Sequence, residues 1–67
     1  MLFEAMIYNR DVRNLVAKKQ RHDMYTNDWA DLHYIEVEAR DLNDARRIME
    51  RKYPPSRGFV IEQIIEL

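Results

Sequence analysis

The sequence predicts a single α+β domain in which one main helix covers one face of a three-stranded sheet. Three segments have the apolar patterning of strands. Between the last two lies a segment with a helical apolar stripe, a capping residue at its start and prolines at its end. The chain of 67 residues can bury one hydrophobic core but not two. Residues 1–67 are therefore expected to form one domain.

Residues 2–8 are the first predicted strand. Apolar side chains occupy both of its faces, and only Glu4 interrupts the run. A strand that is apolar on both faces usually lies in the middle of a sheet. We therefore place this strand at the centre.

The segment after this strand is expected to form a short helix, from about residue 11 to about residue 20. Asn9 or Asp11 can cap it, and Val12, Leu15 and Val16 recur at helical spacing. A mobile excursion between two strands is the alternative, because a helix of about ten residues is marginal without packing. Residues 22–30 show no periodicity and are a predicted loop.

Residues 32–39 are the second predicted strand, since their side chains alternate between the two faces of a half-buried strand. Ile35 and Val37 point to one face, and Tyr34 and Glu36 point to the other. The first pair is expected to face the core, and the second pair is expected to lie on the opposite side of the sheet.

The clearest helical signal follows this second strand. Asp41 is placed to cap a helix, and Asp44 three residues later approximates a capping box. Pro54 and Pro55 end the helix, because neither residue has a backbone N–H to donate. The apolar stripe of this helix consists of Leu42, Ala45, Ile48, Met49 and Tyr53.

Residues 59–67 are the third predicted strand, and Gly58 before it is expected to adopt a turn conformation with positive φ. The connection through the helix is long enough for a right-handed crossover between parallel strands. With the first strand antiparallel between the other two, the sheet order is second, first, third. Simple alternation places Phe59, Ile61 and Ile65 under the helix and Val60, Glu62, Ile64 and Glu66 on the opposite side.

The residues that chemistry needs are scarce in this chain. It has no cysteine and one glycine, so neither a thiolate site nor a phosphate-cradling glycine loop can be built. The two histidines, His22 and His33, fit no metal-ligand spacing. Glu36 and Glu38 share a strand face, but paired carboxylates on an open sheet are more often a solubilising surface than a catalytic pair. We expect no catalytic residues, no metal and no cofactor.

Composition favours a soluble protein of the cytoplasm. Hydrophobic residues make up 46% of the chain and charged residues 34%, which is a globular balance. No apolar run approaches the roughly 20 residues that a membrane span needs. The first residues lack the pattern of a signal peptide, and the absence of cysteine fits an intracellular location.

The sheet face opposite the main helix is the predicted site of protein binding. Apolar side chains there interleave with Glu4 and other glutamates, and an apolar patch rimmed by like charge often marks an interface. A second arrangement stays open, in which the first helix folds over this face. The two outer strands also have free edges that could pair with a partner or a second copy. The predicted binding residues are Tyr34, Glu36, Glu38, Glu62 and Ile64.

A nucleic-acid site is the alternative. Residues 10–22 carry five Lys/Arg and a single acid in a chain whose net charge is −1. Cations on one short helix can neutralise phosphates, and the aromatic residues that follow could stack on bases. The residues predicted for this site are Arg13, Lys18, Lys19, Arg21 and Trp29.

Part of the sequence resembles a family of very small phage proteins. The segment EARDLNDA at residues 38–45, the YPP at residues 53–55 and the GFVI at residues 58–61 are similar to the inhibitor of bacterial RNA polymerase made by T-odd podophages. That family has a strand, strand, helix, strand layout and docks on the polymerase jaw, where it obstructs promoter opening. The resemblance implies the same fold, a phage origin and a host protein complex as the target.

The resemblance covers about residues 34–65 and implies no residue roles. The inhibitors carry arginines on the last strand that matter for polymerase contact, and the matching positions here are Gln63 and Ile65. The segment at residues 9–30 is also longer than in that family. A strand followed by an A-x-x-L-x-x-A-R-R-I pattern is similar, in addition, to parts of some anti-CRISPR proteins.

The function expected from these observations is that of a non-enzymatic, phage-type regulator. Such a protein binds a host protein complex and inhibits or redirects it, with bacterial RNA polymerase as the leading target. A nucleic-acid-binding module and a structural subunit that assembles with copies of itself are the alternatives.

Overall fold

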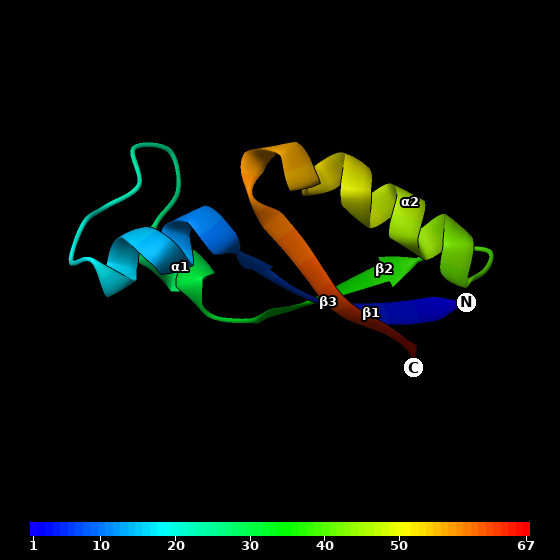
Figure 1. The fold of residues 1–67 in the computed structure, drawn as a ribbon. Coiled ribbons are helices and arrows are strands. Elements are labelled where there is room, and N and C mark those ends of the chain that lie inside the picture. Colours follow the sequence, from blue (N-terminus) through cyan, green and yellow to red (C-terminus); the bar gives the residue numbers. More distant parts are fainter.

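The computed structural model describes residues 1–67, which form three strands, two α-helices and two short 3₁₀ segments. Strand β1 (Leu2–Asn9) lies between β2 (His33–Glu38) and β3 (Phe59–Glu66) and is antiparallel to both. Helix α2 (Leu42–Lys52) connects β2 to β3 (Figure 1). The α+β class, the sheet order and the place of the main helix are confirmed.

The hydrophobic core lies between α2 and one face of the sheet. Phe3, Ala5 and Ile7 of β1 point into it, and Ala45 and Met49 of α2 meet them. Fully burying a side chain such as Phe or Ile stabilises the fold by about 1.5–3 kcal/mol. Val37, Ala39 and Phe59 complete the buried cluster.

The predicted cap of α2 is present. Asp41 has extended backbone, and its side chain accepts a hydrogen bond from the backbone N–H of Asp44 at 2.8 Å. The Asp44 carboxylate reaches back to the backbone N–H of Arg40 at 3.0 Å, one residue earlier than a capping box requires. At the other end, the prolines lead into the 3₁₀ segment η2 (Pro55–Arg57) and Gly58 has φ of 91°.

Acid is expected to weaken this helix start. The pKa of Asp44 is lowered, first by the hydrogen bond from the Arg40 backbone and then by the Arg40 side chain. A carboxyl group whose pKa is lower in the folded state stabilises the fold above its unfolded pKa, and this contribution is lost as the pH falls. The urea concentration at half-unfolding, measured from about pH 7 to about pH 3, should therefore decrease once the pH is below about 4. Asp44→Asn should flatten this dependence, whereas the exposed Asp31→Asn should leave it unchanged.

Helix α1 (Arg10–Ala17) follows β1 directly and is capped by Asn9. It ends earlier than predicted, at Ala17, because the backbone N–H of Lys19 and Gln20 turn back to the carbonyls of Val16 and Leu15. Lys19 adopts φ of 58° in this turn, a position that glycine usually fills. The mobile-excursion alternative is therefore wrong for the helical residues. The predicted loop contains a 3₁₀ segment, η1 (Asn27–Ala30).

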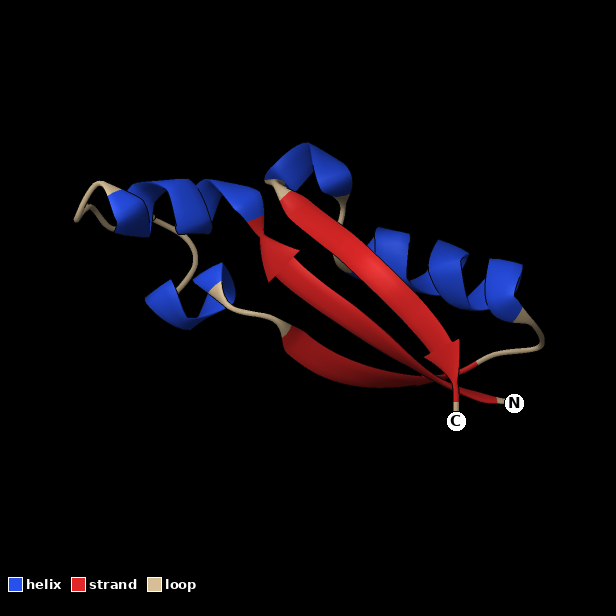
Figure 2. Ribbon diagram, turned by 60° about the horizontal axis from the view of Figure 1, so that its bottom comes forward, coloured by secondary structure: helices blue, strands red, loops and turns tan.

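Helix α1 extends beyond the end of the sheet and does not fold over it (Figures 1 and 2). The molecule is therefore elongated, with extents of 40 × 20 × 14 Å. Helix α1 packs mainly on η1. The arrangement in which this helix covers the second face of the sheet is wrong.

A β-bulge in β3 corrects the predicted faces of that strand. The register with β1 passes from Met6–Gln63 to Ile7–Ile61, so Glu62 is an extra residue. Alternation is therefore shifted by one position after the bulge. Ile64 pairs with Ala5 and packs against the core, which makes its predicted place on the binding face wrong. Ile65, predicted to face the core, pairs with Glu4 on the opposite face.

Candidate protein-interaction surface

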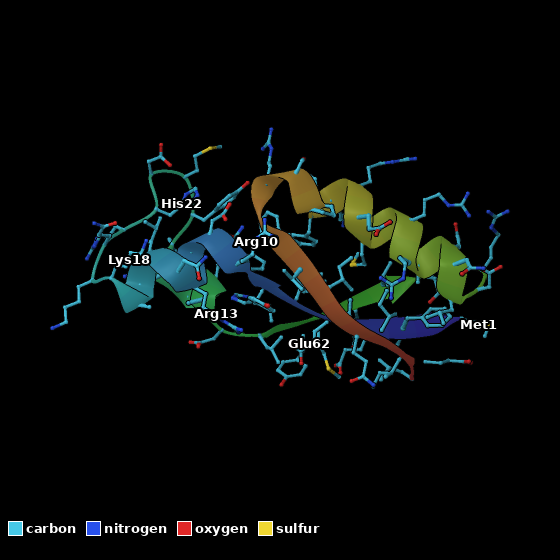
Figure 3. All side chains as sticks on the ribbon, viewed as in Figure 1. Met1, Arg10, Arg13, Lys18, His22 and Glu62 are labelled. Atoms are coloured by element: carbon cyan, nitrogen blue, oxygen red, sulfur yellow. The ribbon has the colours of Figure 1, made fainter.

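The sheet surface that α2 does not cover is the candidate site, and we call it the open face (Figure 2). The strand pairing brings one row of side chains from each strand onto it. Glu62, at the bulge, also lies on the side facing away from α2 (Figure 3). Apart from Glu62, the open face consists of Leu2, Glu4, Met6, Tyr8, Tyr34, Glu36, Glu38, Val60, Gln63 and Ile65.

Met6 and Tyr34 lie side by side as an apolar pair on the open face. Met6 of β1 pairs with Tyr34 of β2 on one side and with Gln63 of β3 on the other. Tyr34 is 61% exposed, whereas every other aromatic residue of the chain is buried or half-buried. A large, flat, amphipathic ring that already stands free of the fold is the kind of side chain that anchors protein interfaces.

Glutamates of like charge face one another across the strands. Glu4 and Glu36 are register partners, so their Cβ atoms are about 4.5–5.5 Å apart, a spacing at which like charges repel. Neither residue forms an ion pair, and neither does Glu62. Glu38 pairs with the α-amino group of Met1 at 2.8 Å. The open face therefore holds unneutralised negative charge beside Met6 and Tyr34.

One arginine borders the open face at the end nearest α1. The guanidinium of Arg13 lies 3.6 Å from the centre of the Tyr8 ring, which is a cation–π contact. Its Nε also donates to the backbone oxygen of Ala30 at 2.8 Å. Arg13 was predicted to bind nucleic acid, but both contacts hold it against the protein itself.

The other residues of the predicted nucleic-acid site are spread over several structural roles. Lys18 and Lys19 close the C-terminal end of α1, and Arg21 lies in the loop that follows. Trp29 stacks on His33, with ring centres 3.9 Å apart. The concave surface beside Trp29 is lined by cations from outside residues 10–22.

The structure places four of the five residues predicted for protein binding on the open face: Tyr34, Glu36, Glu38 and Glu62. Sequence reasoning missed Ile65 and Gln63 as residues of this face, because alternation without a bulge assigns them to the other face. It also missed the Arg13–Tyr8 contact, since nothing in the spacing shows where a helix after the strand will point.

No group of three or more His, Asp or Glu side chains is placed to hold a metal ion. No helix is both long and apolar enough to cross a bilayer.

The comparisons with known proteins leave the family of the chain open. No family model, no curated protein and no solved structure matches this sequence or its fold. The resemblance to the podophage polymerase inhibitors therefore stays a prediction drawn from the sequence.

Proposed function

We propose that this protein is a non-enzymatic binding module that docks its open face on a partner protein. The observation that carries the proposal is the facing pair Glu4 and Glu36, unneutralised and adjacent to the exposed ring of Tyr34. Like charges opposite one another in a sheet destabilise the fold by some tenths of a kcal/mol. A partner that supplies cations would relieve this repulsion on binding.

The partner surface that fits is basic around an apolar centre. Lysines or arginines would meet the glutamates at the rim, and an apolar or aromatic group would cover Met6 and Tyr34. Opposite charges steer the encounter and fix the register, while the buried central side chains supply most of the affinity.

The biological role we propose is that of a phage-type regulator that inhibits or redirects a host protein complex. Bacterial RNA polymerase is the first target to test, and its support is the resemblance at residues 38–61. Binding of the purified enzyme to immobilised protein would test the target, and capture from nuclease-treated bacterial lysate would extend the search to other complexes.

Tyr34→Ala is expected to weaken binding to the partner by about 30-fold or more, as truncation of a central interface aromatic does. Folding stability should change little, because the Tyr34 side chain is mostly exposed in the free protein. Affinity can be measured by surface plasmon resonance and stability by urea unfolding.

Met24→Ala is the matched control, because Met24 is a similarly exposed large apolar residue located in the loop after α1. Its affinity should equal that of the wild type. If Tyr34→Ala binds as tightly as the wild type, the open face is not the docking surface.

A further inference from the structure

The concave surface beside Trp29 lies away from the open face, where the chain around η1 meets the end of α2 and η2. This pocket has a volume of about 470 Å³, within the range of small-molecule sites. Its lining comes from two stretches that are distant in the chain, residues 25–29 and residues 51–59. We call it the aromatic pocket; the residues that matter here are Tyr25, Trp29, Tyr53, Arg51, Lys52 and Arg57.

The aromatic rings of the pocket pack on one buried ring. Trp29 and Tyr53 stand edge-on to Phe59, with ring centres 5.2 and 5.3 Å away, and Tyr25 does so at 5.0 Å. Trp29 also stacks on His33, with ring centres 3.9 Å apart. These side chains are only half-buried although they are locked in place, so they present fixed aromatic surface to the pocket.

The pocket is cationic as well as aromatic. Arg51, Lys52 and Arg57 line it, and none of the three forms an ion pair with an acid. No Asp or Glu is among the lining residues. Three cations without an ion-pair partner beside an aromatic wall suit a ligand that is both planar and anionic.

We infer that the aromatic pocket binds a nucleotide unit, with the base against the aromatic rings and the phosphate on the cations. Aromatic side chains stack on any base, because every base has a π-face. Arginine forks match phosphate oxygens, and a phosphate monoester carries about two negative charges at neutral pH. The site differs from the predicted basic segment at residues 10–22, and it does not depend on the open face.

Trp29 is the only tryptophan in the chain, so its fluorescence reports on this pocket alone. Adenosine 5′-monophosphate is expected to quench the emission saturably. Adenosine, which lacks the phosphate, should bind at least about tenfold more weakly. Inorganic phosphate should compete with the nucleotide without quenching by itself.

The variant that tests the cations is Arg51→Gln with Arg57→Gln. Neither side chain makes a hydrogen bond or an ion pair in the fold, so the variant should stay folded. Its affinity for the monophosphate should fall about tenfold or more. Arg46→Gln with Lys18→Gln removes the same charge outside the pocket and should bind as the wild type does.

The same titration distinguishes two sources of the ligand. Affinity that is unchanged from the monophosphate to a 5′-phosphorylated pentanucleotide indicates a free nucleotide, and affinity that rises with length indicates single-stranded nucleic acid. Absence of saturable quenching would overturn the inference, as would equal loss in the pocket variant and its control. Tighter binding of a phosphotyrosine peptide than of every nucleotide would also overturn it, because the ligand would then be a protein.

Discussion

Asn9→Leu is expected to destabilise the protein by about 3 kcal/mol, the largest effect of any single polar substitution that we foresee. Asn9 has no solvent exposure although it is polar. Its Oδ1 accepts from the backbone N–H of Val12 at 3.0 Å, and its Nδ2 donates to the backbone oxygen of Arg57 at 3.0 Å. The residue thereby ties the end of β1 to the start of α1 and to η2.

Leucine can neither accept the hydrogen bond from Val12 nor donate to Arg57, so both hydrogen bonds are lost. Loss of an N-terminal cap costs about 0.5–2 kcal/mol, and a buried polar group left without a partner costs about 1–3 kcal/mol. The Asn9 side chain also lies close against Gly58, since a Cβ added to Gly58 would be only 2.9 Å from Asn9 Oδ1. A leucine side chain, which has a different shape, would therefore meet the backbone there. Thermal unfolding should show a melting temperature lower by roughly 12–24 °C, at about 4–8 °C per kcal/mol in a domain of this size.

Asn9→Ser separates the two hydrogen bonds, because its hydroxyl can still accept from Val12 but the donor to Arg57 is lost. It should cost less than the leucine variant. Asn14→Ala, at an exposed position of the same helix, should change the melting temperature by only a few degrees. A leucine variant as stable as the wild type would contradict the role assigned to Asn9.

Glu36→Lys is expected to change binding and stability in opposite directions. Affinity for the partner should fall about 10–100-fold, since a repelling charge replaces an attracting one at a basic interface. Stability should rise by about 0.5 kcal/mol, because the new lysine would face Glu4 and turn a repulsion into an attraction. Titration with the purified partner and urea unfolding measure the two effects on the same preparation.

The control for Glu36→Lys is Glu50→Lys, which reverses the same charge at an exposed position of α2. It should leave affinity unchanged, apart from a small effect on the rate of association. If Glu36→Lys lowers both stability and affinity, the loss of binding reflects damage to the sheet and the open face loses its strongest support.

Much of the fold was predictable because its signals are local. The cap at Asp41, the stop at Pro54 and the turn at Gly58 each depend on the chemistry of one residue, and all three are present. The bulge was not predictable, because Glu62 is neither glycine nor proline and no periodicity marks it. The direction of α1 was not predictable either, since Asn9 fixes it through a contact with Arg57, 48 positions along the chain.

The open face and the aromatic pocket also differ in how far the sequence predicts them. The glutamates of the open face follow from alternation within single strands, so Glu36 and Glu38 could be assigned from the sequence. The aromatic pocket joins the chain near η1, the end of α2 and the start of β3. Only the packing of residues 25–29 against residues 51–59 brings Trp29 to Arg51 and Arg57, and no pattern within either stretch predicts it.

The bulge also determines how β3 tolerates the deletion of a residue. Isoleucine occupies both positions that follow Gln63, so losing one residue before them, with the bulge kept, would place Ile65 opposite Ala5 and move Ile64 to the open face. A slip of one residue normally turns the apolar set of a strand outward. Here the strand shortened by one residue still presents an isoleucine to Ala5, so this half of β3 can absorb the loss of one residue at the bulge.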